Sequence, residues 1–293
     1  MRFSTRSLRL TLFSGLACLV AYFGANTALA WKFTSGLTHP ACQPGAAPSA
    51  DLPSPQEIQL QPGMIQLQAW YYPSQNGAAV IALGGLPGSL GDRLPPVKFL
   101  VLHGYGLLQI DSRACAAPPA AVTLGANEVM DVAAGLEFLK TRPEVARVGV
   151  LGFSMGGVTA IRAAARYPDI AAVVAEGGYF NLGEDFVSSG EHQSTLRRIL
   201  LYHVAGVFWL QTGINPWRIS PVDDLPRISP RPVMLIYGED EAASGKAQAQ
   251  LSAALPPKTL WLVPGGSHGR NHLAAPVEYE QRVLEFFDQA LRK

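Results

Sequence analysis

Apolar and polar residues alternate in two short stretches near residue 60, and a continuous apolar run follows them. Residues 57–61 and 64–72 alternate on either side of Pro62-Gly63, which predicts two antiparallel strands joined by a turn. Residues 78–83 are apolar without a break and end in Gly84-Gly85, which is typical of a strand buried on both faces. This part of the chain therefore predicts a hairpin beside a central strand.

Beyond residue 93, stretches with helical spacing alternate with short apolar runs. The helical patterns cover 94–102 and 125–140, and the strand patterns cover 107–111, 147–151, 170–175, 233–237 and 259–263. Strands separated by helices form parallel sheets that are covered by helices on both faces. The sequence therefore predicts an α/β fold over residues 56–293, with a mostly parallel central sheet and an antiparallel hairpin at its N-terminal side.

Composition agrees with a chain that buries a large core. Of the 293 residues, 48% are hydrophobic and 15% are charged, which excludes intrinsic disorder. The 23 Lys and Arg nearly balance the 22 Asp and Glu, so the formal charge is +1 and no nucleic-acid partner is expected.

The first thirty residues have the layout of an export signal. Arg2, Arg6 and Arg9 precede an apolar stretch, and the segment ends in the small-x-small pattern Ala28-Leu29-Ala30. We expect a signal peptide that is cleaved after Ala30. The alternative is an uncleaved membrane anchor, because residues 10–30 are long enough to cross a bilayer. In both cases we expect the rest of the chain outside the cytoplasm. A cleaved chain would be periplasmic or secreted, and an uncleaved chain would be anchored and face outward. This segment is the only membrane contact that we expect.

Residues 31–55 are rich in Pro, Ala, Gly and Ser and predict an extended linker. Of the three cysteines, Cys18 lies in the signal segment, which leaves Cys42 and Cys115. An oxidising compartment allows these two to form a disulfide, and the alternative is a pair of unrelated small side chains. Neither cysteine has a CxxC partner, so no metal site is expected.

A possible nucleophile lies between a predicted strand and a predicted helix. The stretch Gly152-Phe153-Ser154-Met155-Gly156 has the pattern G-x-S-x-G, with the strand pattern before it and helix-forming residues 158–166 after it. In such a turn the serine adopts strained backbone angles, and the two glycines let strand and helix pass closely. We therefore expect Ser154 to be a nucleophile. The alternative is a serine that caps an ordinary helix.

A serine hydroxyl needs a base to take its proton and a carboxylate to orient that base. His268 follows the strand pattern 259–263 in a glycine-rich loop, at the sheet edge where α/β folds place their chemistry. The strand pattern 233–237 ends in Gly238, and Glu239, Asp240 and Glu241 follow it directly. The spacing thus predicts His268 as the base and an acid from this group as its partner.

The order Ser154, acid, His268 resembles the α/β-hydrolase superfamily, and the resemblance covers roughly residues 57–293. Asp111-Ser112-Arg113 is similar to the D-x-R that ends the fourth strand in that family, and residues 220–225 are similar to its usual approach to the acid-bearing strand. The resemblance implies the α/β-hydrolase fold and a Ser-His-acid triad. It implies neither a metal nor an organic cofactor.

The resemblance also assigns the remaining site residues. The family acid stands three residues after the strand-end glycine, which corresponds to Glu241, and Asp240 is the alternative. The two backbone amides that stabilise a developing oxyanion correspond to those of Leu86 and Met155.

Residues 181–220 form an insertion that a minimal fold of this kind does not need. They include an apolar helix interrupted by Gly206 and too short to span a membrane. We expect this segment to cover the site as a helical cap. It either lines the acyl side of a substrate or packs as ordinary core.

The sequence therefore predicts an exported serine hydrolase that cleaves a small-molecule carboxylic ester, or alternatively an amide or thioester, through an acyl-enzyme. Within enzymes the alternatives are a serine peptidase and a dienelactone-type hydrolase. A hypothesis from another class is a noncatalytic binding or scaffold protein with the same fold. Neither the acyl group nor the oligomeric state follows from the sequence.

Overall fold

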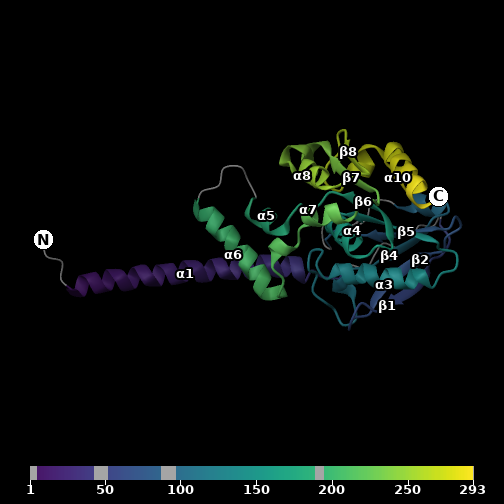
Figure 1. The fold of residues 1–293 in the computed structure, drawn as a ribbon. Helices are drawn as coiled ribbons and strands as arrows, with labels where there is room; N and C mark the ends of the chain where they lie inside the picture. The colour runs from purple at the N-terminus through teal and green to yellow at the C-terminus, as the bar shows by residue number, and fades with distance from the viewer. Residues whose placement is uncertain (1–4, 43–51, 87–96, 189–194, 293) are drawn as a thin grey trace.

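The computed structural model describes residues 5–42, 52–86, 97–188 and 195–292. Within these ranges eight strands form one sheet in the order β1-β2-β4-β3-β5-β6-β7-β8 (Figure 1). The strands are β1 (Gln56–Leu60), β2 (Leu67–Tyr72), β3 (Ala78–Leu83), β4 (Gly106–Ile110), β5 (Arg147–Phe153), β6 (Ile170–Glu176), β7 (Val233–Gly238) and β8 (Lys258–Val263). The predicted α/β fold with a mostly parallel sheet is confirmed.

The predicted hairpin is β1 and β2, which pair antiparallel with Glu57 opposite Trp70. Strand β2 begins at Leu67, three residues later than the alternating pattern indicated, because residues 62–64 form the turn. From β4 to β8 each neighbouring pair is parallel, and β3 lies between β4 and β5 at the centre with all six residues buried. The carboxyl ends of the parallel strands therefore meet at one edge of the sheet.

Helices cover both faces of the sheet through two separate apolar clusters. One face packs against α3 (Glu128–Lys140), α4 (Met155–Arg166) and α8 (Lys246–Ala253). The other packs against α2 (Lys98–Leu102) and α10 (Pro276–Leu291). The helix expected over 94–102 begins at Lys98, and residues 94–96 lie outside the described residues. Burial on both faces explains why the central strands β3, β6 and β7 are mainly apolar.

The N-terminal segment is one helix, α1 (Thr5–Thr38), which passes through Ala30 without a break. The expectation of an extended linker from residue 31 is therefore wrong for residues 31–38. Ala30, Thr34 and Thr38 are buried at helical spacing, and the Thr34 and Thr38 hydroxyls donate to the carbonyls four residues earlier. Packing of this stripe against the domain outweighs the weak helix propensity of the stretch.

Two further features of the N-terminal region bear on export. Residues Leu12–Thr38 of α1 are long and apolar enough to cross a membrane, a test that a signal sequence also meets. Cys42 and Cys115 form a disulfide, with their Cα atoms 4.8 Å apart, so the predicted pairing is present. It fastens the end of the N-terminal segment to the turn after β4.

The insertion contains α5 (Leu182–Val187) and α6 (Thr195–Thr212), and returns to the sheet through α7 (Pro221–Asp224). Helix α6 is continuous, so the predicted interruption at Gly206 is wrong. A glycine weakens a helix interior by only about 1 kcal/mol. Burial of the neighbouring Ala205, Val207 and Phe208 outweighs that loss.

Candidate active site

Ser154 occupies the sharp turn between β5 and α4, with φ +54° and ψ −116°. A Cβ atom at Gly152 would come within 2.0 Å of the Gly156 carbonyl oxygen, and one at Gly156 within 2.3 Å of the Leu83 carbonyl oxygen. Only glycine fits at both positions. The sequence spacing therefore reflects a close passage of strand β5, helix α4 and the end of β3 around Ser154.

The structure brings Ser154, His268 and Glu241 together from three separate parts of the chain. His268 Nε2 lies 3.0 Å from Ser154 Oγ, and His268 Nδ1 lies 2.9 Å from Glu241 Oε1. The second Glu241 oxygen accepts a hydrogen bond of 2.9 Å from the Gly238 amide. Asp240, one residue earlier, is exposed. The geometry therefore favours Glu241 over Asp240 as the acid that faces the imidazole.

The imidazole of His268 rests against the end of β6 and against the elbow. A Cβ atom at Gly177 would lie 2.9 Å from both Cε1 and Nδ1 of His268. The Phe153 ring is 5.0 Å from the imidazole, tilted by 38°. The His268 side chain is 47% exposed and that of Glu241 only 18%, so the acid is sheltered and the base faces solvent.

Hydrogen bonding and charge shift both ionisable groups of this pair. The hydrogen bond with Glu241 raises the pKa of His268, against an opposing effect of burial. Burial raises the pKa of Glu241, but hydrogen bonds from His268 and from the Gly238 amide outweigh it and hold that pKa below its usual value. Glu241 is therefore ionised near neutral pH, as a group that orients and stabilises an imidazolium needs to be.

Behind this pair lies a buried carboxylate that the sequence reasoning missed. Glu176 ends β6 and accepts hydrogen bonds from Asn271 Nδ2, at 3.0 Å, and from the Tyr279 hydroxyl, at 2.7 Å. The backbone carbonyl of Glu176 accepts a 2.7 Å hydrogen bond from the Ser154 amide. Burial raises the pKa of Glu176 to about 7. An acid that directly ends an apolar strand pattern was the available signal. Glu176 joins the elbow, the short helix α9 (Asn271–Ala274) and α10 in one polar cluster.

The residues expected to stabilise an oxyanion lie beside the nucleophile. Met155 is the first residue of α4, and Leu86 is half-buried shortly after β3. A Cβ atom at Gly85 would lie 3.4 Å from the Ser154 Cβ, so the backbone leading to Leu86 passes next to Ser154. Residues 87–96 lie outside the described residues. The amide roles of Leu86 and Met155 stay predictions.

An apolar cluster connects this site with the insertion. It draws its members from the loops after β3 and β4, from α4 and from the insertion, with one contribution from the end of α1. The buried members are Ala114, Val122, Leu124, Met155, Val158, Leu182, Phe208 and Ile219, and Leu37, Leu86, Phe186 and Ile214 are among those that pack around them. The insertion therefore contacts the same side chains that flank the nucleophile, as a cap would.

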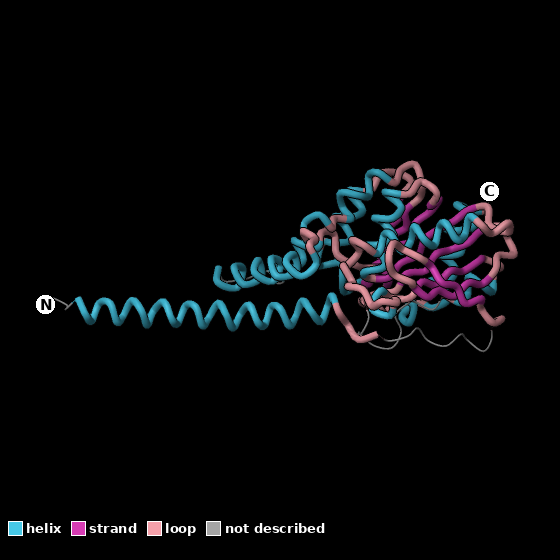
Figure 2. Tube along the Cα trace, turned by 90° about the horizontal axis from the view of Figure 1, so that it is seen from below, coloured by secondary structure: helices cyan, strands magenta, loops and turns pink. Residues whose placement is uncertain are grey.

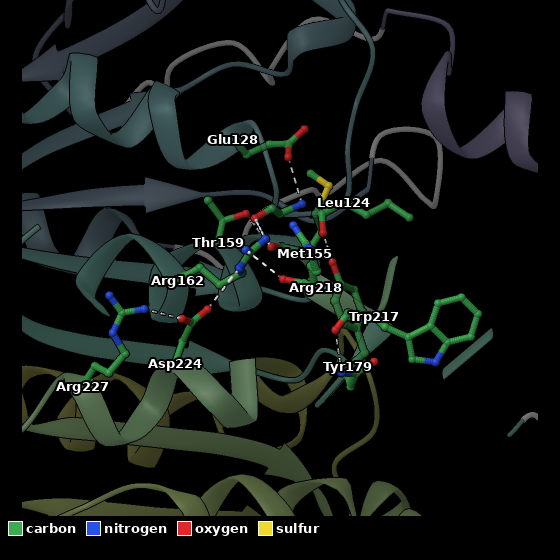
Figure 3. Close-up of polar contacts among 12 residues, drawn as sticks. Leu124, Glu128, Met155, Thr159, Arg162, Tyr179, Trp217, Arg218, Asp224 and Arg227 are labelled. Atoms are coloured by element: carbon green, nitrogen blue, oxygen red, sulfur yellow. Dashed lines mark hydrogen bonds and ion pairs between the residues drawn. The ribbon is translucent and has the colours of Figure 1, made fainter. Parts of the chain in front are cut away.

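Polar contacts fasten the insertion to the helix that follows Ser154 (Figure 3). Arg162 in α4 donates to Asp224 at 3.2 Å, to the Gly125 carbonyl at 2.7 Å and to the Arg218 carbonyl at 3.2 Å. Next to the Gly125 contact, the Tyr179 hydroxyl donates to the Leu124 carbonyl. The return segment of the insertion is thus held in place against the elbow helix.

Within the ranges that the structure describes, no three His, Cys, Asp or Glu side chains gather in a way that suits a metal ion. The polar groups around Ser154 are instead arranged for proton transfer. An imidazole with one nitrogen on a hydroxyl and the other on a carboxylate can take up a proton from that hydroxyl and deliver it elsewhere.

Comparisons with known proteins agree with this fold. A family model described as the alpha/beta hydrolase fold matches residues 78–193. No curated protein matches the chain. Among solved structures, the Pyrococcus furiosus esterase Pf2001 is 23% identical, with 86% of this chain and 99% of that chain covered and a TM-score of 0.65.

Two further similar structures cover nearly the same part of this chain. The Pyrococcus horikoshii acylaminoacyl peptidase is 18% identical, with 83% of this chain and 43% of that one covered and a TM-score of 0.64. The alpha/beta hydrolase GrgF from a Penicillium species is 18% identical, with 83% and 100% covered and a TM-score of 0.62. Together with the sheet order and the elbow at Ser154, these similarities show that the chain has the α/β-hydrolase fold.

Proposed function

We propose that this protein is a serine hydrolase that cleaves a carboxylic ester through an acyl-enzyme, on the outer side of a membrane. The observation that carries the proposal is the bridge made by His268, with Nε2 3.0 Å from Ser154 Oγ and Nδ1 2.9 Å from Glu241 Oε1. Both distances lie within hydrogen-bonding range, and the order of the three groups is that of a nucleophile, a base and its orienting acid.

In the acylation step, Ser154 Oγ forms a bond to the carbonyl carbon while His268 Nε2 accepts the hydroxyl proton. The carbonyl electron pair moves to its oxygen, where the amides of Leu86 and Met155 stabilise the negative charge. When the intermediate collapses, the carbon–oxygen bond to the alcohol breaks and His268 returns the proton to the departing oxygen. Water then repeats the sequence on the acyl-serine, releases the acid and restores Ser154.

Glu241 acts throughout without transferring a proton itself. Its carboxylate holds the Nδ1–H of His268, which keeps Nε2 free to accept the serine proton and stabilises the imidazolium that forms. The lowered pKa of Glu241 and the raised pKa of His268 both support this role.

As the substrate, an ester is favoured over a peptide by the share of each similar structure that the comparison matches. The structure titled an esterase is matched over 99% of its length, whereas the acylaminoacyl peptidase is matched over 43% of its length. The apolar candidate span in α1 and the Cys42–Cys115 disulfide support a location outside the cytoplasm.

Substitution of the nucleophile tests the proposal. Ser154→Ala is expected to lower turnover of a short p-nitrophenyl ester by about four to six orders of magnitude and to abolish labelling by a fluorophosphonate. Ser252→Ala, at an exposed serine in α8, is the matched control and should keep full activity. Undiminished hydrolysis by a folded Ser154→Ala protein would refute the proposal, and a wild-type protein that takes up no fluorophosphonate would favour a noncatalytic role.

A further inference from the structure

Helix α6 of the insertion has an apolar face that is largely exposed, although the ring of Tyr202 on this face stacks on Trp217 with 5.9 Å between the centroids. Its inner side is buried, and Ala205 and Phe208 point into the domain. On the opposite side, residues at helical spacing are largely exposed, at 50%, 47%, 49% and 81% of their surface. We call this the outer face of α6: Ile199, Tyr202, Trp209 and Leu210. Contiguous exposed apolar residues of this size mark a contact surface.

Helix α6 lies alongside the second half of α1. Thr27 Oγ1 is 2.9 Å from His203 Nε2, and Gln211 Nε2 donates to Ser35 Oγ at 2.8 Å. The contact in the middle of α6 is made to Thr27, and the contact near its end is made to Ser35, which comes later in α1. The two helices therefore run in the same direction. Both project from the same side of the domain in two perpendicular views (Figures 1 and 2).

The part of α1 that extends beyond these contacts is exposed and apolar. Its large exposed side chains are Leu12, Phe13, Leu16, Leu19, Val20, Tyr22 and Phe23. If this part of α1 crosses a bilayer, the start of α6 reaches the same membrane surface. At about 1.5 Å per residue, Ile199 lies about 6 Å nearer the start of α6, along its axis, than His203, which contacts Thr27.

The charges of α6 fit a lipid surface. Arg197 and Arg198 lie in its first turns and are exposed, and its 18 residues contain neither Asp nor Glu. Basic side chains beside an apolar and aromatic face are the composition of helices that bind at the boundary between headgroups and acyl chains. Tyr and Trp on the same face also favour that boundary.

We propose that the outer face of α6 inserts into the outer leaflet of the bilayer that α1 spans, and that the site takes its substrate as an acyl ester from this leaflet. The second half of the proposal rests on the proposed hydrolase function. Phe208, on the inner side of α6, belongs to the same apolar cluster as Met155 and Leu86. One helix thereby connects the lipid surface with the side chains that flank the nucleophile. The proposal requires the uncleaved anchor, because cleavage after Ala30 would remove Thr27 and its contact with His203.

Depth-dependent quenching tests the lipid contact independently of activity. The full-length chain with Cys18→Ala is reconstituted into vesicles of phosphatidylcholine and phosphatidylglycerol, and a fluorescent label is attached at Ile199→Cys. Leu255→Cys is the matched control, since Leu255 is also 50% exposed and lies on the loop after α8. Lipids with a nitroxide on the acyl chain should quench the label at 199 and leave the label at 255 bright. Equal quenching at both sites, or none at 199, would overturn the proposal.

Kinetics test the delivery of substrate. Ile199→Asp should leave turnover of a water-soluble short ester unchanged and lower turnover of a long-chain ester in vesicles about tenfold, because moving an isoleucine-sized side chain out of water is worth about that factor. Leu255→Asp should change neither. An equal loss on both substrates, or no loss on either, contradicts lipid delivery.

The outcomes separate the two proposals. If Ser154→Ala keeps its activity, the hydrolase proposal fails while the quenching result still reports on α6. If the label at 199 is already shielded in detergent and the protein has twice the monomer mass, the outer face of α6 binds a second copy of the chain, and the lipid proposal is wrong.

Discussion

Substitution of Gly177 by alanine tests whether the position of the imidazole, rather than its mere presence, determines activity. Gly177 has φ +64°, and an added Cβ would lie 2.9 Å from Cε1 and Nδ1 of His268. Ordinary contact between such atoms begins near 3.4 Å, so the ring must retreat by about half an ångström. The separation of Nε2 from Ser154 Oγ, now 3.0 Å, would then approach the limit of a hydrogen bond.

Gly177→Ala is expected to have two separate effects, one on stability and one on the rate. A positive φ costs a residue with a side chain about 1–2 kcal/mol, which lowers the melting temperature by a few degrees in a chain of this size. A misplacement of about 1 Å in a catalytic group costs about a hundredfold in rate, so half of that displacement is expected to cost about tenfold. We therefore expect kcat/KM for a short ester to fall about ten- to a hundredfold in Gly177→Ala.

Gly63→Ala separates the two effects. Gly63 has φ +74° in the turn between β1 and β2, and an added Cβ there would meet no atom within 4 Å. This variant should lose a similar amount of stability and keep its kcat/KM. Steady-state kinetics and thermal unfolding of both variants make the comparison. Full activity in Gly177→Ala, with a melting temperature lowered as in Gly63→Ala, would refute the reasoning.

Three further predictions concern the acid, the pH dependence and the disulfide. Glu241→Gln should reduce kcat about a thousandfold or more, because the acid orients and stabilises the imidazolium, whereas Asp240→Asn should leave kcat nearly unchanged. A large loss of kcat in Asp240→Asn alone would assign the role of the acid to Asp240. The hydrogen bond with Glu241 raises the pKa of His268, and the neutral ring is the active base. As the solution is acidified, kcat/KM of the wild type should therefore begin to fall at a pH above the usual histidine value, and Glu241→Gln should move this fall to lower pH. A pH profile of Glu241→Gln identical to that of the wild type would contradict an effect of Glu241 on the pKa of His268. Cys42→Ser should lower the free energy of unfolding by about 4 kcal/mol, since the disulfide with Cys115 closes a loop of 73 residues. A denaturation midpoint equal to that of the wild type would contradict this and show that other contacts restrain the loop.

Local patterns in the sequence carried most of the fold. The strand patterns at 78–83, 147–151 and 259–263 correspond to β3, β5 and β8. The first two are apolar because they are buried inside the parallel sheet, whereas β8 is an edge strand and is partly exposed. The glycines two residues before and after Ser154 were also readable, since the close passage at the elbow leaves no room for a side chain.

Other features depended on contacts between distant parts of the chain. Residues 31–38 lack a helical pattern that stands out, yet α1 continues through them because Thr34 and Thr38 are buried against the domain. Gly206 looked like a break in the cap helix, and burial of its neighbours keeps α6 whole. In both places tertiary packing outweighs local propensity.

The sequence by itself determined the order of strands and helices along the chain, the turn at Ser154 and the presence of an imidazole and an acid at the edge where the parallel strands end. Only the tertiary structure decided that Glu241 rather than Asp240 faces His268, that Glu176 lies buried behind them and that Cys42 meets Cys115. Periodicity and turn chemistry act between near neighbours in the chain, and the sequence displays them directly. Hydrogen bonds, burial and disulfides join residues brought together by the folding of the whole chain, so their partners emerge only in three dimensions.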